Sequence, residues 1–223
     1  MKDNISAFSS SEYDTKIKQT IPFYEVFYEQ IIELVKAYYE DNALTWLDVG
    51  CGTGKMADMA FTNVELEKFV FCDCSEKMIE IVKERFPFRN AEYIVCDVQE
   101  LPYSGEFDVI TTIQVNHYLQ EGQRKYALKK YYEALKKNGL YISFENFAPF
   151  TDDGRCVYLK RWKSYQIESG KSMPESEEHI ARYGKEYYPV SVTENLKLMR
   201  ECGFKTVEIL WLSNMQIGIW GIK

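Results

Sequence analysis

The stretch Leu47-Asp48-Val49-Gly50-Cys51-Gly52-Thr53-Gly54-Lys55 joins an apolar run that ends in an acid to three glycines at every second position. The apolar run predicts a short strand, and the residues from Lys55 onward predict a helix. Glycine lets the backbone turn tightly and approach a ligand where a Cβ would clash. We therefore expect a nucleotide-like ligand over a helix N-terminus, at the carboxyl edge of a sheet. Asp48 adds a negative charge beside the loop, which favours a ligand with a cationic part.

Apolar runs and helical patterns alternate on both sides of this loop. Continuous apolar strands separated by helices indicate a parallel sheet that is covered on both faces. Asn138-Gly139 is expected to end one of the helices in a left-handed cap, and Ser75 to begin another. The predicted strands are 45–49, 69–73, 91–96, 107–113 and 140–144, and the predicted helices are 22–39, one from Lys55, one after Ser75 and 120–137.

The pattern changes at the two ends of the chain. Residues 1–20 are polar, which is typical of a mobile arm, and residues 170–190 are polar and turn-rich. An aromatic-rich helix is predicted between 155 and 169. A further helix over 193–202, with Gly203 as its C-cap, precedes two strands at 204–212 and 215–222 that predict a terminal antiparallel hairpin.

Composition and charge limit the function classes. The chain has 223 residues, of which 46% are hydrophobic and 27% charged, as in an ordinary globular protein. Its net charge of −7 argues against a broad phosphate-binding surface, so we expect no nucleic-acid partner. The first residues lack the apolar core of a signal peptide, and no stretch approaches a membrane span of about 20 apolar residues. The six cysteines suggest neither a disulfide scaffold nor a common zinc pattern. We therefore expect a cytoplasmic protein without a membrane partner or a metal site.

Acids follow three successive predicted strands. Asp48 belongs to the first strand, Asp73 ends the second and Asp97 follows the third. Open α/β sheets bind ligands at the carboxyl ends of their strands, where these acids would meet. Asp73 is suited to accept hydrogen bonds from two ribose hydroxyls, and Asp97 from the exocyclic amine of adenine, with Met78 and Val98 on either side of the ring. Each acid could instead be a helix cap or turn residue, but their coincidence favours a nucleoside ligand.

These motifs resemble those of the class I S-adenosylmethionine-dependent methyltransferases. Residues 48–54 are similar to their first motif, Asp73 to their ribose-binding acid and 96–98 to their adenine-binding turn; 107–119 and 135–140 are similar to their later motifs. The resemblance implies an α/β, Rossmann-like fold with seven strands in the order 3-2-1-4-5-7-6. It also implies helices on both faces, an antiparallel last strand and a small helical cap. The expected segments are an N-terminal arm and helix (1–40), a cofactor-binding core (41–148), a cap insertion (149–190) and a final helix with a terminal hairpin that completes the core (191–223).

The resemblance also implies the cofactor, S-adenosylmethionine, and the residues that contact it. The acids suit this cofactor, because its sulfonium is cationic and it carries no phosphate. We expect methyl transfer by in-line displacement to a small-molecule acceptor, since the negative net charge of the chain disfavours a nucleic-acid substrate. The expected cofactor contacts are Tyr13, Tyr24, Asp48, Gly50, Cys51, Gly52, Gly54, Asp73, Cys74, Met78, Asp97, Val98, Ile113 and Gln114.

His117 is the candidate catalytic residue. It is one of only two histidines and falls just after the fourth strand, where an acceptor should lie. It could act as a general base or as an orienting group, or simply pack beside the site. Trp162, Arg182 and Tyr187 in the cap are the candidate acceptor contacts, and the alternative is that the cap aromatics only pack against the sheet.

A second, looser resemblance is to the carboxy-S-adenosylmethionine synthases, which share the fold and modify the cofactor itself. Tyr24 is similar to a tyrosine at the methionyl end of their cofactor, and Arg182 to an arginine that binds the added carboxylate. The chain departs from that family where Phe23 replaces a glycine, and the segment after Arg182 is about two residues shorter. Two other classes stay open: a non-catalytic S-adenosylmethionine-binding protein, and a nicotinamide dehydrogenase, which the position of Asp48 disfavours.

Overall fold

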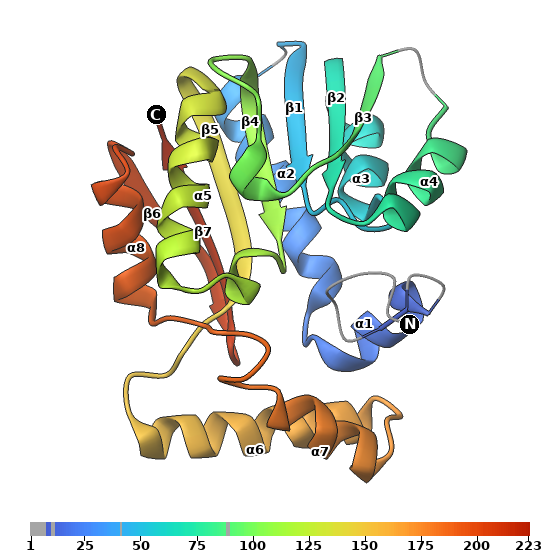
Figure 1. Ribbon diagram of the computed structural model, residues 1–223, viewed down its shortest axis with the longest axis vertical. Coiled ribbons are helices and arrows are strands. Elements are labelled where there is room, and N and C mark those ends of the chain that lie inside the picture. The colour runs from blue at the N-terminus through green and yellow to red at the C-terminus, as the bar shows by residue number, and fades with distance from the viewer. Residues whose placement is uncertain (1–7, 10–11, 41, 88–89) are drawn as a thin grey trace.

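The computed structural model describes residues 8–9, 12–40, 42–87 and 90–223. One seven-stranded sheet runs through the protein in the order β3-β2-β1-β4-β5-β7-β6 (Figure 1). The first five strands are parallel, and β7 is antiparallel to both of its neighbours. The predicted fold class and strand order are therefore confirmed. The strands are β1 (Leu44–Val49), β2 (Leu66–Asp73), β3 (Ala91–Val95), β4 (Phe107–Ile113), β5 (Leu135–Asn146), β6 (Thr206–Ser213) and β7 (Gln216–Ile222).

Helices cover both faces of the sheet. One apolar cluster packs α2, α3 and α4 against one face, and a second packs α5 and α8 against the other. The helices α6 and α7 lie across the end of the molecule to which the parallel strands point, with α1 beside them (Figure 1). The helices are α1 (Tyr13–Thr20), α2 (Tyr24–Tyr39), α3 (Lys55–Asn63), α4 (Glu76–Arg85), η1 (Val98–Glu100), η2 (Asn116–Tyr118), α5 (Glu121–Ala134), α6 (Asp152–Glu168), α7 (Met173–Ala181) and α8 (Val192–Glu201).

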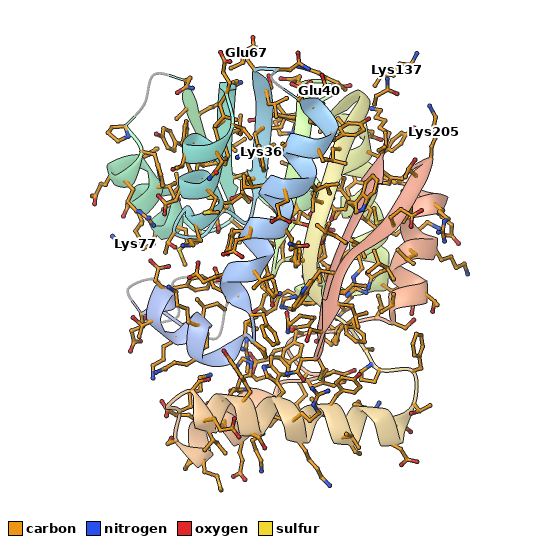
Figure 2. All side chains as sticks on the ribbon, turned by 180° about the vertical axis from the view of Figure 1, so that it is seen from behind. Lys36, Glu40, Glu67, Lys77, Lys137 and Lys205 are labelled. Carbon is orange, nitrogen blue, oxygen red and sulfur yellow. The ribbon has the colours of Figure 1, made fainter. Side chains whose placement is uncertain are left out.

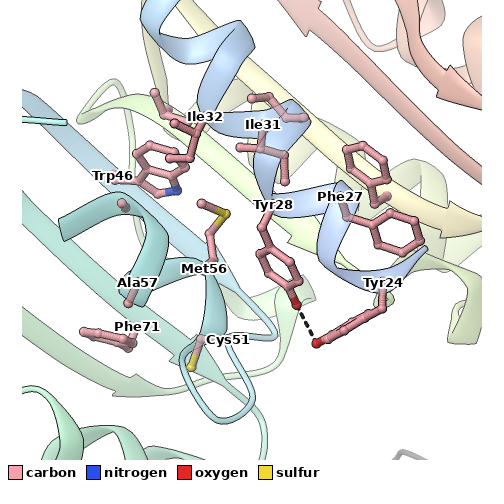
Figure 3. Close-up of a cluster of buried hydrophobic side chains, with 14 of the residues drawn as sticks. Tyr24, Phe27, Tyr28, Ile31, Ile32, Trp46, Cys51, Met56, Ala57 and Phe71 are labelled. Atoms are coloured by element: carbon pink, nitrogen blue, oxygen red, sulfur yellow. Dashed lines mark hydrogen bonds between the residues drawn. The ribbon is translucent and has the colours of Figure 1, made fainter. Parts of the chain in front are cut away.

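Apolar side chains fill the layers between the sheet and the helices. Charged side chains such as those of Lys36, Glu67 and Lys205 project from the periphery instead (Figure 2). The cluster under α2 brings Ile31 and Ile32 close to Trp46 of β1, while Met56 and Ala57 of α3 border it (Figure 3). This packing holds α3, the helix that follows the glycine loop, against α2 and β1.

The expected N-terminal arm is partly wrong. Residues 13–20 form α1, which buries Ile17 and Thr20, while residues 1–7 and 10–11 of the expected arm lie outside the described residues. Trp162 of α6 donates a hydrogen bond from Nε1 to the carbonyl oxygen of Thr20 over 2.6 Å. Because this partner lies 142 residues away, a short polar helix gains the tertiary support that its local sequence does not reveal.

The end of α5 also differs from its prediction. The helix stops at Ala134 rather than Lys137, because Leu135 already pairs with Phe107 of β4. Asn138 adopts the left-handed conformation with a φ of 62°, but it does so inside β5, next to a break in the strand register. Asn138-Gly139 is therefore part of an irregular strand start and not a helix cap.

The turn-rich segment 170–190 contains a helix that was not predicted. Ser172 begins α7 with a capping box, in which its hydroxyl accepts from the Glu175 backbone and the Glu175 carboxylate accepts from the Ser172 backbone. Pro174 stands in the first turn, where a missing N–H costs nothing. The flanking Gly170 and Gly184 had made the whole segment resemble a loop.

Candidate functional site

The glycine loop has the tight geometry that its spacing predicts. Gly50, Gly52 and Gly54 all have positive φ angles, of 69°, 52° and 87°. A Cβ at Gly50 would lie 2.3 Å from Cγ2 of Val115, and one at Gly54 would lie 2.5 Å from the Phe86 ring. At Gly52 the nearest atom would be 4.0 Å away, on the Tyr13 ring. Gly50 and Gly54 therefore let the loop pack closely, whereas Gly52 leaves its space open toward the cavity.

The three acids meet at this edge of the sheet. Asp73 accepts hydrogen bonds from the backbone N–H of Gly52 over 3.0 Å and of Ser75 over 2.9 Å, so it ties the glycine loop to the start of α4. Asp97 caps η1 by accepting from the Gln99 N–H. Asp48 is buried and accepts from the Thr111 hydroxyl over 2.7 Å.

A cavity of about 750 Å³ opens over the loop. Ten of the predicted cofactor contacts line it, namely Tyr13, Gly50, Gly52, Asp73, Cys74, Met78, Asp97, Val98, Ile113 and Gln114. Tyr24, Asp48 and Cys51 line a smaller adjoining cavity, which shares Tyr13, Gly50, Gly52 and Ile113 with the first. Gly54 lines neither of these two cavities. Its lack of a side chain instead lets the loop pack against Phe86. Val115, Tyr118, Leu119 and Cys96 also line the main cavity; they fall in the resembling motifs 96–98 and 107–119 but were not among the expected cofactor contacts.

Tyr24 stands at the start of α2, directly after an unusual backbone conformation. Its hydroxyl accepts a hydrogen bond from the Tyr28 hydroxyl, one helical turn further on (Figure 3). Phe23 precedes it with a φ of 60°, a left-handed conformation that glycine adopts most easily. The chain therefore keeps a glycine-like turn at this position although its side chain is large.

Burial raises the pKa of two acids at this edge, Asp48 and Asp73. It raises the pKa of Asp48 to about 7, and it raises the pKa of Asp73 against the opposing effect of its backbone hydrogen bonds. No lysine or arginine pairs with either carboxylate among the described residues. A cationic ligand would supply the charge that the protein omits, and this is the requirement that a sulfonium nucleoside meets.

We expect S-adenosylmethionine to bind more tightly as the pH rises toward 7. Below its pKa, buried Asp48 must release a proton before it can face a cation, so binding pays that cost in acid. One proton corresponds to a change of up to about tenfold in affinity per pH unit below the pKa, levelling off above it. Titration calorimetry between pH 6 and 8 would measure this slope.

Asp48→Asn is the matched control for this experiment, because its amide oxygen can still accept from Thr111. The variant keeps any contribution from Asp73 and from the ligand's own amino group. Its affinity should therefore vary less steeply with pH than that of the unmodified protein. Equal slopes for the two proteins would remove Asp48 from the charge recognition.

A second cavity adjoins the first, beneath the cap. The two cavities share Tyr13, Gln114 and Tyr118, so a ligand in one borders a ligand in the other. His117, Arg182 and Tyr187, three of the predicted catalytic and acceptor residues, line this second cavity. His179 of α7 also lines it, and burial lowers the pKa of this imidazole well below its usual range.

Trp162 is not among the residues that line this cavity. It is buried in the cap, where it bonds to Thr20 and packs edge-on against the rings of His179 and Tyr187. Its position supports the wall of the cavity from behind. The structure thus separates the predicted acceptor contacts into two residues that face the cavity and one that holds them.

The comparisons with known proteins agree with this geometry. The model of a methyltransferase domain matches residues 47–139, which include the glycine loop and all three acids. The carboxy-S-adenosyl-L-methionine synthase of Nautilia profundicola is 23% identical over 92% of this chain and 88% of its own length. The synthase of the same name from Staphylococcus epidermidis is 19% identical over 96% of this chain and 94% of its own length.

Residues 47–139 form a methyltransferase domain of the S-adenosylmethionine-dependent type. The YcgJ protein of Bacillus subtilis has the same fold, with a TM-score of 0.64, 14% identity and coverage of 87% of this chain and 98% of that protein. The CurJ carbon methyltransferase superposes with a TM-score of 0.67, at 18% identity, over 96% of this chain and 59% of that one. With this domain, the protein is a methyltransferase with S-adenosylmethionine as its cofactor.

The residues that line the main cavity are chemically suited to S-adenosylmethionine. Asp73 and Asp97 border the main cavity, and the loop at Gly52 leaves room where a side chain would intrude. The bound cofactor supplies an electrophilic methyl group on a positively charged sulfur. Tyr13 and Tyr118 line both this cavity and the adjoining cavity beneath the cap. No helix within the described part of the chain is long and apolar enough to cross a membrane.

Proposed function

We propose that this methyltransferase acts on a small acceptor that carries a carboxylate, bound in the cavity under the cap. A buried guanidinium carries this proposal. Arg182 is 8% exposed, and its Nη2 has no hydrogen-bond partner among the described residues. Its Nε donates to Glu186 over 2.8 Å, which leaves the unpartnered Nη2 available to donate to a ligand.

The neighbours of Arg182 support an anionic ligand. The hydroxyl of Tyr187 is buried and also lacks a partner among the described residues, and its ring stacks under the guanidinium at 5.9 Å. The Tyr118 side chain lies close enough for the guanidinium to oppose the rise that burial causes in the pKa of its phenol. A carboxylate would satisfy both unpartnered donors, and burial makes such charge-assisted bonds strong.

The enclosure supports a small acceptor over a macromolecule. The cavity is bordered by α1, η2 and the cap, with Phe8, Ile17 and Ile21 among its lining residues. The net charge of −7 also disfavours a polyanionic substrate.

Arg182→Gln should raise the KM for the acceptor by about 10² while affinity for S-adenosylhomocysteine stays within about twofold. Losing a charge-assisted hydrogen bond costs about 1.5–3 kcal/mol. The KM of Arg182→Lys should lie between those of the unmodified enzyme and Arg182→Gln, because lysine keeps the positive charge but lacks the planar guanidinium. Arg155→Gln, on the exposed side of α6, is the matched control.

The assay incubates the enzyme with methyl-deuterated S-adenosylmethionine and a small-metabolite extract. Mass spectrometry then detects labelled products, and anion exchange separates those with a carboxylate. A labelled anionic product that depends on Arg182 supports the proposal. Label confined to neutral metabolites, or to protein or nucleic acid, contradicts it.

A second candidate is synthesis of carboxy-S-adenosylmethionine. The two relatives with that name align over nine-tenths of this chain, cap included. Phe23, which stands where that family has a glycine, keeps a left-handed backbone. The Arg182 guanidinium, one side chain away from the cofactor cavity through Tyr118, would then hold a carboxylate on the cofactor itself.

The nucleoside that co-purifies with the protein separates the two candidates. Denaturing the protein and measuring the released ligand would show S-adenosylmethionine or its demethylated product under the first proposal. A nucleoside heavier than S-adenosylmethionine by one carbon dioxide would favour the second.

We also propose the segment roles expected from the sequence: 1–40 and 149–190 enclose the acceptor, while 41–148 and 191–223 form the core. All six cysteines are free, which supports a reducing compartment such as the cytoplasm. Limited proteolysis with and without S-adenosylhomocysteine would test the segment boundaries, since ligand should protect α1 and the cap together.

A further inference from the structure

A buried carboxylate stands behind His117. Glu145, near the end of β5, is 3% exposed, and its Oε2 lies 2.7 Å from Nδ1 of His117. The same carboxylate accepts from the backbone N–H groups of Asn116, over 2.9 Å, and of Val115 and His117, over 3.3 Å each. The Ser143 hydroxyl donates to it over 3.1 Å. Every contact that the structure gives this carboxylate therefore presents a donor.

This arrangement determines which nitrogen of His117 carries the proton. A carboxylate surrounded by donors is an acceptor, so Nδ1 must donate to it, and in the neutral imidazole Nε2 is then left with a lone pair. Nε2 makes no hydrogen bond with the residues that the structure describes, and the imidazole lines the acceptor cavity. The rings of Tyr118 and Tyr187 pack against it, at 4.4 and 5.9 Å between centroids. The ring is thus held in one orientation with a free base facing the cavity.

We propose that Glu145 is a positioning residue that makes His117 a general base, and that the acceptor nucleophile is a hydroxyl. The inference rests on the proposed function, because it concerns the acceptor in the same cavity. A hydroxyl is a weak nucleophile until it loses its proton, so a dedicated base is useful for this acceptor. A thiol is far more acidic and gains less.

The reaction balances without any further reagent. The hydroxyl oxygen forms a bond to the methyl carbon, and the carbon–sulfur bond breaks with its electron pair remaining on sulfur. The hydroxyl proton passes to Nε2, giving an imidazolium that the Glu145 carboxylate stabilises. The proton then leaves to solvent with the products, which are a methyl ether and the neutral thioether of the cofactor.

The first test is the ring tautomer, observed by ¹H–¹⁵N correlation spectroscopy of the two histidines. His179→Gln leaves a single imidazole and assigns the signals. The unmodified protein should show His117 protonated at Nδ1. In Glu145→Gln the amide can donate to Nδ1, so His117 should change to the Nε2-protonated form. An unchanged tautomer in this variant would overturn the positioning role.

The second test compares two carboxylate probes that differ only in the nucleophile, 4-hydroxyphenylacetate and 4-mercaptophenylacetate. Glu145→Gln and His117→Gln should each lower kcat for the phenol by about 10²–10³, the usual contribution of general base catalysis. For the thiol the loss should be less than about fivefold, and KM for S-adenosylmethionine should be unchanged. Equal losses for both probes would mean that Glu145 only supports the local fold.

The outcomes keep the two proposals separate. If the unmodified enzyme binds S-adenosylhomocysteine but methylates neither probe, the choice of a carboxylate acceptor fails, while the tautomer experiment still decides the role of Glu145. Glu186→Gln, which removes the exposed acid that accepts a hydrogen bond from Arg182, controls for loss of a carboxylate charge elsewhere than at Glu145. It should leave the His117 tautomer unchanged.

Discussion

Asp73→Ala should weaken the binding of S-adenosylhomocysteine by about 10²–10³. The carboxylate already holds the Gly52 and Ser75 N–H groups, and we expect its remaining lone pairs to accept the ribose hydroxyls. Each charge-assisted hydrogen bond is worth about 1.5–3 kcal/mol, so the lower part of this range for two bonds, about 3–4 kcal/mol, accounts for a loss of this size. Titration calorimetry of the purified variant measures the effect directly.

Asp73→Asn sharpens the interpretation. Its amide keeps one acceptor atom but loses the charge, so its affinity should fall between those of the unmodified protein and Asp73→Ala. Asp153→Ala removes an exposed acid from the cap helix α6 and should not change the affinity. If Asp73→Ala bound as tightly as Asp153→Ala, the carboxylate would serve only as a turn and cap residue, the alternative that its sequence position also allows.

Phe144→Ala should lower the free energy of unfolding by about 3–5 kcal/mol, the usual cost of removing a buried phenylalanine ring. The side chain is fully buried in β5 and stacks on Phe27 of α2 at 4.7 Å between ring centroids. It therefore joins the sheet to the helix that precedes the glycine loop in the chain. Urea denaturation would measure the loss, and Val157→Ala, at a side chain that is 57% exposed, should change stability little.

Gly218 offers a second variant to confirm the packing argument. It pairs with Phe144 across β7, and a Cβ there would lie 2.4 Å from the Phe144 ring. Gly218→Ala should therefore be destabilising by itself. In the double variant with Phe144→Ala the new methyl group enters the vacated space, so the combined loss should be smaller than the sum of the two. Additive losses would contradict a direct contact between these positions.

The central strands were predictable because their apolar runs end in chemically distinctive residues. β4 was placed at 107–113 and the helix α3 at Lys55, as the structure has them. The failures share a different cause. α1 depends on Thr20 meeting Trp162, and the end of α5 depends on Leu135 meeting Phe107, both contacts that local sequence does not encode. The helix α7 did carry its signal, the Ser172-Glu175 capping box, beside glycines that concealed it.

Most residues of the cofactor cavity were predictable from the positions of the strand ends, since loops at the carboxyl ends of parallel strands converge. Tyr118 and Leu119 were missed because their positions depend on η2. The backbone of η2 donates hydrogen bonds to the distant Glu145, a contact that local sequence does not reveal. Glu145 itself had a usable signal, an acid at the end of an otherwise apolar fifth strand. The pairing with His117 spans 28 residues, and only the sheet register brings the two together.

The side chains of Tyr13, Gln114 and Tyr118 border both the cofactor cavity and the acceptor cavity. A ligand that moves these side chains in one cavity therefore also changes the shape of the other cavity. If the acceptor binds in the second cavity, as proposed, we expect the free energies of the two binding events to depend on each other. Thermodynamic linkage then requires that the factor by which the cofactor changes affinity for the acceptor equals the factor by which the acceptor changes affinity for the cofactor. The wall shared by the two cavities would then couple the binding of the cofactor and of the acceptor in both directions.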